Sequence, residues 1–346
     1  MRFGSIICLL IYLIGCQPAN LQKYKYLYQF RGEQVKPGQA LNFPTDHGEH
    51  IKQGLEWWYL TANLTDESGQ TFGAQWTLFR VLSKKPIDSI WWNNQLYIGH
   101  FALETNNEHV AFEYFARAQQ AYVQNNPFQA RINNWVLQSK SSSFLPLSLK
   151  AQAKDMAIDL ELKDSPRVLH GENGYSQKTP EGQASYYYSY PLLKAKGQLT
   201  WRNKTYQVKG MAWFDREWSG GLLNPKYRGW DWFSIQKENN QGALMIFCMR
   251  NMEQQYKFCR GTDIKADGTS TSLKNSAIDL HPLKTVSIEG RDYPIKWDLV
   301  INHTTEIEID AVNQNSLNNL FLPYWEGRIE AKGSFQGQGY VELTGY

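Results

Sequence analysis

The sequence predicts an all-β protein with two antiparallel β-barrels in tandem. Short stretches in which apolar and polar residues alternate recur along the 346-residue chain, and turn residues separate them. No long stretch shows the apolar spacing of an amphipathic helix. A tryptophan-rich hairpin pattern that ends on an arginine occurs twice, at residues 56–80 and 229–250. Such a repeat indicates two similar β domains, with a site within or between them.

The first fifteen residues are expected to be a secretory signal. Arg2 precedes an apolar stretch, residues 5–14, that is shorter than the ~20 residues needed to cross a bilayer. Residues 13–16, Leu-Ile-Gly-Cys, resemble the lipobox of bacterial lipoproteins, which implies that Cys16 is lipidated and that residues 16–27 form a tether. Gln17 then favours the outer membrane, with the protein facing the periplasm or the cell surface. An ordinary signal peptide with a chance cysteine is the alternative.

The rest of the chain divides into an expected first barrel, residues 28–220, and an expected second barrel, residues 221–346, with the boundary near Gly220-Gly221. Residues 115–123 are predicted to form one short helix. The alternating stretches that predict strands are 56–64, 72–80, 158–162, 206–208, 229–236, 243–250, 293–301 and 306–310.

Two cysteines of the second barrel flank a turn around Glu253-Gln254. In a hairpin centred on this turn, Cys248 and Cys259 would lie opposite each other across the two strands. An exported protein can keep a disulfide, so the pair is either bonded or two free buried thiols. Both alternatives are structural, because no Cys-x-x-Cys or Cys-His spacing suggests a metal site.

The composition is unusual in its aromatic residues, 13 Trp, 20 Tyr and 16 Phe, which suit both sheet packing and a cavity for an apolar ligand. No block of Lys and Arg stands out, so we predict no nucleic-acid partner. The sequence contains no Gly-x-Ser-x-Gly elbow, phosphate-binding loop or dinucleotide fingerprint. We therefore predict no cofactor, and disfavour serine-hydrolase and nucleotide chemistry.

Residues 210–219 contain charged and tryptophan side chains that the formation of a β-sheet does not require. If they form a strand, Trp213, Asp215 and Glu217 share one face. Phe214, Arg216 and Trp218 then share the other face, and the sequence leaves open which face points into the barrel. One interpretation is a carboxyl group in an apolar pocket, with a raised pKa that makes it a general acid. The other is a salt bridge at the domain interface, joining Arg216 to Glu56 or Glu326.

Two further segments have polar and aromatic residues with several interpretations. His47, His50 and Glu49 have a spacing that gives only weak support for a metal, and we predict none. The histidines either form hydrogen bonds within a loop, or His47 acts as a general base. The tyrosine run at 185–191 either packs across strands or uses its hydroxyls, such as that of Tyr187, to orient the polar end of a ligand.

Four segments together resemble the AttH-like proteins related to carotenoid 1,2-hydratases, whose secreted members are often labelled secreted hydrolases. The segments are Phe-Pro-Thr-Asp-His-Gly at 43–48, Glu-Trp-Trp-Tyr at 56–59, Ala-Trp-Phe-Asp-Arg-Glu-Trp-Ser at 212–219 and Tyr-Trp-Glu-Gly at 324–327. The resemblance covers residues 28–346. It implies two lipocalin-like β-barrels in tandem.

The resemblance also implies a site. The hydratase branch adds water across a terminal carbon–carbon double bond of an acyclic carotenoid, and related fungal proteins act as cyclases on polyketides. By motif position, Asp215 would protonate an alkene, and Glu217 or His47 would assist. Family members often have His after this Asp, where this chain has Arg216. The residues expected to line the ligand site are Glu56, Trp58, Tyr187, Trp213, Trp218, Tyr324 and Trp325.

Three functions are compatible with the sequence. The first is an enzyme, a hydratase, hydrolase or isomerase that uses Asp215 on a hydrophobic small molecule. The second is a carrier that binds a lipid or isoprenoid without chemistry. The third is an interaction module with an envelope protein as partner. In each case the N-terminal lipid anchors the protein to the membrane.

Overall fold

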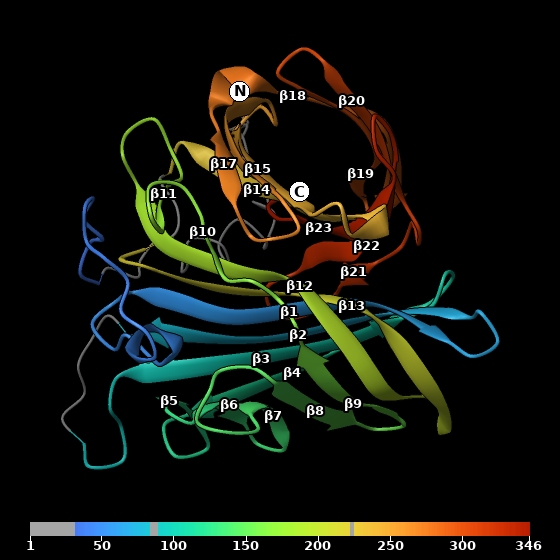
Figure 1. The fold of residues 1–346 in the computed structure, drawn as a ribbon. Coiled ribbons are helices and arrows are strands. Elements are labelled where there is room, and N and C mark those ends of the chain that lie inside the picture. The colour runs from blue at the N-terminus through green and yellow to red at the C-terminus, as the bar shows by residue number, and fades with distance from the viewer. Residues whose placement is uncertain (1–31, 84–88, 222–224) are drawn as a thin grey trace, which may run out of the picture.

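The computed structural model describes residues 32–83, 89–221 and 225–346, which form two curled antiparallel sheets. Figure 1 shows the second sheet as a ring of strands above the broad first sheet. This confirms the predicted all-β fold with two barrel-like units. In the described residues, the helical elements are three short 3-10 turns, Thr45–His47, Glu238–Asn240 and Asn275–Ala277. The predicted signal segment, Cys16 and the tether lie outside the described residues.

The first sheet has its strands in the order β4-β3-β2-β1-β13-β12-β9-β8-β7-β6-β5, and β10 and β11 pair with β12. Its strands are β1 (Leu55–Asp66), β2 (Thr71–Leu82), β3 (Gln95–Glu104), β4 (His109–Arg117), β5 (Ala121–Asn125), β6 (Phe128–Ile132), β7 (Trp135–Ser139), β8 (Leu147–Ala153), β9 (Met156–Lys163), β10 (Val168–Leu169), β11 (Tyr175–Gln177), β12 (Ala184–Trp201) and β13 (Lys204–Ser219).

The second sheet has the order β17-β16-β15-β14-β23-β22-β20-β19-β18, and β21 pairs with β22. Its strands are β14 (Tyr227–Lys237), β15 (Ala243–Asn251), β16 (Tyr256–Ile264), β17 (Ser270–Leu273), β18 (Ile278–Ile288), β19 (Arg291–Ile301), β20 (Thr305–Ala311), β21 (Leu317–Asn318), β22 (Tyr324–Gly333) and β23 (Gly337–Leu343).

The tryptophan-rich repeat forms the same hairpin in both sheets, as the sequence predicts. Strand β1 pairs with β2 in the first sheet, and β14 pairs with β15 in the second. Each hairpin then pairs its first strand with the last long strand of its own sheet, β13 or β23. The two sheets therefore share a core topology, which makes positions on β13 and β23 equivalent.

The helix predicted at 115–123 is wrong. Strand β4 continues through Arg117, and β5 starts at Ala121 after a tight turn. Phe115 lies opposite Ile98 of β3, so pairing with a long neighbouring strand decides the local structure. The short apolar run at this position carries no helical period strong enough to compete with that pairing.

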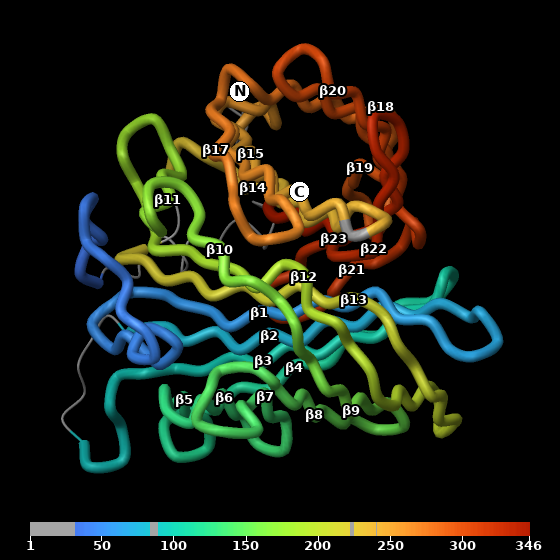
Figure 2. The backbone as a smooth tube through the Cα atoms, in the orientation of Figure 1, coloured from blue at the N-terminus to red at the C-terminus, as the bar shows by residue number. Residues whose placement is uncertain are grey.

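Buried apolar side chains form three clusters. One fills the first barrel and one fills the second. The third lies between the barrels and includes Tyr59, Tyr187, Trp213 and Trp232. The backbone trace in Figure 2 shows β22 and β23 on the side of the second barrel that faces β1 and β13. We call this region between the two sheets the seam.

The register of β1 and β13 decides which side chains reach the seam. Trp58 lies opposite Arg216, and Tyr59 lies opposite Asp215. Because opposed residues share a face of the sheet, these two pairs point to opposite sides. Trp58 belongs to the core of the first barrel, whereas Tyr59 belongs to the seam. Asp215 therefore faces the second barrel.

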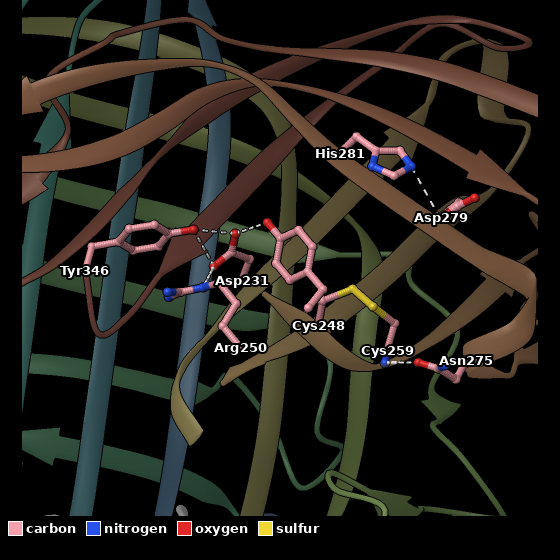
Figure 3. Close-up of a disulfide and its surroundings, with 9 residues drawn as sticks. Asp231, Cys248, Arg250, Cys259, Asn275, Asp279, His281 and Tyr346 are labelled. Atoms are coloured by element: carbon pink, nitrogen blue, oxygen red, sulfur yellow. Dashed lines mark hydrogen bonds and ion pairs between the residues drawn. A yellow bond between two sulfur atoms is a disulfide. The ribbon is translucent and has the colours of Figure 1, made fainter. Parts of the chain in front are cut away.

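A disulfide joins the second strand of the second repeat to the strand that follows it (Figure 3). Cys248 of β15 lies directly opposite Cys259 of β16, and their sulfur atoms are bonded. Of the two alternatives that the sequence leaves open, the structure has the bonded pair. Nearby, Asp231 and Arg250 form a buried ion pair, and the hydroxyl of Tyr346 donates to the same carboxylate (Figure 3).

Candidate functional site

A pocket opens at the seam and is lined by both sheets. Its water-accessible volume is about 150 Å³. Strands β1, β2, β3 and β13 form one wall, and β14, β15 and β23 form the other. The lining is mostly apolar and aromatic, with Leu55, Trp57, Tyr59, Phe79, Val81, Ile98, Trp230, Trp232, Phe247, Met249, Leu322, Pro323 and Tyr324. Ligand sites are commonly concave and apolar, with a few polar groups that converge on the ligand.

Asp215 is the first polar group of this pocket. Its carboxyl accepts hydrogen bonds from the indole N–H of Trp213 (2.6 Å), the hydroxyl of Tyr187 (2.8 Å) and the hydroxyl of Ser189. Burial raises the pKa of Asp215 to about 7, and the charge of Glu217 adds to the rise, whereas the three hydrogen bonds oppose it. Near neutral pH this carboxyl therefore exists in both protonation states.

Glu342 is the second, and it occupies the equivalent position in the other barrel. Asp215 lies opposite Tyr59 of the first repeat, and Glu342 lies opposite Trp232 of the second. The indole N–H of Trp230 donates to Glu342 Oε1 at 2.8 Å. The pKa of Glu342 is raised to about 7. Burial is the main cause and the charges of Asp215 and Glu217 add to the rise, whereas this hydrogen bond lowers the pKa. The pocket thus holds two carboxyls that titrate in the same range.

Glu217 provides a third carboxyl, but it has a cation beside it. Lys178 Nζ lies 2.8 Å from Glu217 Oε1. The same ammonium lies over the rings of Tyr187 and Phe247, at 4.6 Å and 4.4 Å from their centroids. This ion pair gives a charged end to a pocket whose lining is mostly apolar.

The pocket floor continues into a buried polar network. The hydroxyl of Tyr59 donates to Glu326. Burial raises the pKa of Glu326 well above its usual value, and the charge of Glu342 adds to the rise. The hydroxyl of Tyr324 accepts from Gln75 at 2.7 Å and lies 2.9 Å from His100 Nδ1. These contacts join the two barrels with hydrogen bonds, in addition to apolar packing.

Behind Asp215 lies a histidine that sequence reasoning missed. His170 follows β10 and is fully buried. Its Nε2 lies 2.6 Å from Ser189 Oγ, and its Nδ1 lies 2.9 Å from Thr262 Oγ1 of the second barrel. Burial, helped by the charge of Lys178, lowers the pKa of His170 to about 3, so its ring is neutral.

Of the residues predicted to form the site, the structure brings five to the seam. Asp215, Glu217 and Tyr324 line the pocket. Tyr187 and Trp213 lie directly behind Asp215 and donate hydrogen bonds to it. Arg216, the neighbour of Asp215, points to the other side of the sheet, where it pairs with Glu56. The salt bridge to Glu56 is therefore present, but its predicted place at the domain interface is wrong, because the face of β13 that carries Arg216 points into the first barrel.

The other predicted site residues lie on inner faces, away from the pocket. Glu56, fully buried, pairs with Arg80 and Arg216 at one end of the first barrel. Burial alone would raise the pKa of Glu56, but Arg216, His50 and Arg80 hold it below its usual value. This is a structural ion-pair network that holds the loop at 48–53 onto the barrel.

Two predicted ligand residues, Trp58 and Trp218, belong to this same network. The guanidinium of Arg216 lies 3.9 Å from the ring centroid of Trp58 and 4.8 Å from that of Trp218. The ring of His50 stacks on Trp218 at 4.2 Å. Trp325 is also removed from the pocket, because it is fully buried in the core of the second barrel.

His47 does not reach the proposed acid. Its ring stacks on Phe144 at 3.9 Å, and its Nδ1 lies 2.6 Å from the hydroxyl of Tyr188. Tyr188 lies opposite Arg216, on the face of the sheet that points away from the seam. Burial lowers the pKa of His47 to about 3, with the charges of Arg167 and Arg216 adding to the fall. His47 is therefore a neutral packing residue of the first barrel. The sheet lies between it and the pocket.

The sequence contains a partial signal for the missed carboxyl of Glu342 and a direct one for the missed hydroxyl of Ser189. The repeat makes Tyr59 and Trp232 equivalent in the sequence, but only the strand register of the structure then makes Glu342 the counterpart of Asp215. Ser189 stands two residues after Tyr187, so both point to the same face of β12. His170 has no such signal, because only the packing of the two barrels brings it to Ser189 and Thr262.

Comparisons with known proteins agree with this architecture. A family model described as AttH-like matches residues 34–346. A crystal structure described as a candidate AttH from Nitrosomonas europaea is 30% identical, with a TM-score of 0.83, and the alignment covers 91% of this chain and 99% of that one. No curated protein sequence matches the chain at a significant level.

Two solved structures of lower identity share the fold. Kievitone hydratase from Nectria haematococca is 16% identical, with a TM-score of 0.69 and coverage of 92% of this chain and 98% of its own. The protein CghA, in a structure with Sch210972, is 11% identical, with a TM-score of 0.55 and coverage of 92% and 97%. These likenesses support the two-barrel fold alone.

Two further properties concern the residues that the structure describes. Within them, no group of three or more His, Cys, Asp or Glu side chains is arranged to hold a metal ion. Over the same ranges, no helix has the length and apolar character needed to cross a bilayer.

Proposed function

The chain belongs to the AttH-like family, and from this premise we propose that it binds an apolar small molecule at the seam and performs acid–base chemistry on it. The observation that carries the proposal is the pair Asp215 and Glu342. They come from equivalent strands of the two barrels, line one aromatic pocket, and each has a pKa of about 7. General acids and bases work best when their pKa lies near the operating pH.

The reaction class that suits this pocket is the addition of water to a carbon–carbon double bond, or its reverse. In the forward direction Asp215 transfers its proton to one alkene carbon, and the other carbon becomes cationic. The electron-rich faces of Trp57 and Trp232 stabilise that cation. Water then bonds to the cationic carbon while Glu342 accepts a proton from it. The hydratase name of one structural neighbour makes hydration the first reaction class to test.

The proposal is tested with the ligand that the protein itself carries. The mature protein is purified from its own envelope under mild conditions, examined by native mass spectrometry and extracted with organic solvent. We expect a discrete apolar molecule. A clean unliganded mass, with no uptake from an envelope lipid extract, would count against a ligand-binding seam.

The catalytic step is tested with Asp215→Asn and the recovered molecule or its unsaturated precursor. We expect turnover to fall by about 10² to 10⁴ while binding is retained, because general acid catalysis contributes a factor of that size. Glu253→Gln, at an exposed turn, is the matched control and should keep wild-type turnover.

A carrier without chemistry is the second candidate, and one observation favours it. The carboxyl of Asp215 already has three donors, an arrangement that also suits a purely structural anion. A carrier predicts that Asp215→Asn changes ligand binding little, whereas Trp57→Ala weakens it. It also predicts that the recovered molecule returns from incubation chemically unchanged.

We also propose that the protein is an outer-membrane lipoprotein anchored through Cys16. The lipobox-like residues 13–16 support this, and the disulfide Cys248–Cys259 suits an oxidising compartment. Cys16→Ser should move the protein from the membrane fraction to the soluble fraction and remove the mass of the lipid. A variant that stays in the membrane fraction with unchanged mass would contradict the anchor.

A further inference from the structure

The exposed apolar side chains of the protein gather at one end of the molecule. In the described residues seven large apolar side chains are exposed, and Leu283 on β18 is the one that lies elsewhere. Single exposed apolar residues are normal on a protein surface, but a group in one place marks an interaction site. The six that gather are Ile51, Ile90, Trp91, Phe115, Met252 and Phe321, and we call them the apolar rim.

Strand pairing places three side chains of the apolar rim together. The strands are antiparallel, so β1 begins at the end of the first sheet where β2 ends and β3 begins (Figure 1). Ile51 lies in the loop before β1, and Ile90 and Trp91 lie in the connection between β2 and β3. The side chain of Gln95, which starts β3, donates to the backbone carbonyl of Ile51 at 3.3 Å. The two loops therefore touch.

The other three side chains of the apolar rim lie beside the pocket. Phe115 and Phe321 pack edge to face, with ring centroids 5.6 Å apart. Phe115 lies opposite Ile98, and Leu322 follows Phe321; both Ile98 and Leu322 line the pocket. Met252 starts the turn after β15, at the end of the second sheet where β14 begins.

The pocket reaches from Asp215 to this same end of the molecule. Asp215 lies opposite Tyr59 inside the seam. Further along the lining are Leu55, at the start of β1, and Val81, near the end of β2. From the second barrel the lining includes Gly345, which follows β23. Both walls of the pocket therefore extend to the end that carries the apolar rim.

The described chain also starts at the apolar rim. The backbone N–H of Glu33 donates to the carbonyl of Lys52, the neighbour of Ile51, at 2.9 Å. From Cys16, the proposed lipid anchor, to residue 32 the chain reaches at most about 55 Å when fully extended. A lipid held in a membrane through this segment keeps the apolar rim near the bilayer. The high effective concentration then makes a weak apolar contact sufficient.

We propose that the apolar rim inserts into the membrane leaflet that holds the lipid of Cys16, so that the pocket opens onto the bilayer and exchanges its apolar ligand with it. Of the 13 tryptophans, all of which the structure describes, Trp91 alone is exposed. An indole suits the boundary between headgroups and acyl chains, and isoleucine suits the apolar layer beneath. The use of the rim rests on the proposed ligand and anchor, but its binding is measured without either.

The test uses the mature chain from residue 16 with Cys16→Ser, so that no lipid holds the protein on a membrane. We expect this parent chain to float with vesicles of phosphatidylethanolamine and phosphatidylglycerol. Trp91→Asp and Ile90→Asp should each lower its partition coefficient about tenfold or more, because a charge replaces an apolar side chain that the bilayer buries.

Leu283→Asp is the matched control. Leu283 is also exposed, but β18 ends the strand order of the second sheet and does not line the pocket. This variant should float like the parent chain. All three positions are exposed, so circular dichroism should show the parent fold in each variant.

The orientation of the bound protein is tested through Trp91. Lipids brominated in their acyl chains should quench the tryptophan fluorescence of the parent chain. Trp91→Phe keeps an aromatic side chain and should float like the parent, but brominated lipids should quench its fluorescence much less. Equal quenching of the two proteins would show that the apolar rim is not the part that enters the bilayer.

Two further outcomes would overturn membrane docking. One is a parent chain that does not float, or aspartate variants that lose no more binding than Leu283→Asp. The other is a dimer, detected by analytical ultracentrifugation, that Trp91→Asp and Ile90→Asp abolish while vesicle binding is unchanged. The apolar rim would then be an interface between two copies of this chain.

Docking and the proposed function fail separately. If flotation depends on the apolar rim but envelope extraction recovers no bound molecule, docking stands and the proposed function fails. If a bound molecule is recovered and flotation does not depend on the apolar rim, the ligand site stands and docking fails.

Discussion

At the scale of single residues, the two faces of β13 place their ionisable side chains in opposite environments. Arg216 and Glu56 are fully buried and neutralise each other, so both remain charged. Asp215, on the adjacent position, is almost as buried and receives only neutral donors. Its burial therefore favours the uncharged acid. A one-residue step along a strand thus separates a structural ion pair from a candidate proton donor.

Glu342 makes a testable contribution to the pH dependence of stability. Its folded-state pKa is about 7, against about 4.3 in an unfolded chain. Between these values the folded state binds more protons than the unfolded state. The stability that Glu342 contributes is therefore complete below about pH 4 and is lost as the pH rises to about 7.

Glu342→Gln removes this dependence and keeps an oxygen that can accept from Trp230. Its free energy of unfolding should change less than that of wild type between about pH 5 and about pH 8. At the higher pH the variant should be more stable by about 3–4 kcal/mol. Urea unfolding at the two pH values measures this. Equal pH slopes for variant and wild type would show that Glu342 is not held in its acid form.

At the scale of elements, the repeated hairpin carries a buried arginine in both barrels. Arg80 pairs with Glu56 in the first hairpin, and Arg250 pairs with Asp231 in the second. The second hairpin then continues into β16, to which it is tied by the disulfide. An ion pair therefore joins β14 to β15 at the pocket wall, and a covalent bond joins β15 to β16.

Replacing both cysteines with serine should destabilise the second barrel. The cross-link closes a loop with a sequence separation of 11 residues, for which a loss of about 2–3 kcal/mol is expected. Denaturant unfolding of the double variant, compared with wild type with and without reductant, measures the loss. Reductant should leave the double variant unchanged. A double variant as stable as oxidised wild type would show that the bond adds nothing.

At the scale of the whole molecule, the seam joins the barrels through buried polar contacts as well as aromatic packing. Arg328 of β22 donates to Glu104 of β3 through its Nε at 3.0 Å and its backbone N–H at 2.9 Å. Ser316 and His109 also contact this carboxylate. Burial would raise the pKa of Glu104, but His109 and Arg328 hold it below its usual value. The ion pair links the two sheets next to the buried network under the pocket.

We expect wild type to unfold in one calorimetric transition, because an apolar cluster and buried hydrogen bonds join the two barrels. Glu104→Ala leaves Arg328 as an uncompensated buried charge and should cost about 3–5 kcal/mol. It should also separate the transition into two. Exposed Glu330→Ala, on the same strand as Arg328, is the control. Two transitions already present in wild type would contradict this coupling.

The sequence by itself determined the fold class, the tryptophan hairpins and the division of β13 into two faces. Alternation with a period of two is a local property, so it can be recognised without knowing which strands pair. The same property explains the error at residues 115–123, where pairing of Phe115 with β3 outweighed a weak local pattern.

Only the tertiary structure decided the site. Alternation shows that Asp215 and Arg216 face apart, but the packing of the barrels decides which face meets the other barrel. The same packing removed His47, Trp58 and Trp325 from the site and added Glu342, 127 positions away from Asp215 in the sequence. His170 meets Ser189 and Thr262 only across the seam. The raised pKa values follow from burial, which is a property of the assembled fold and of no local segment.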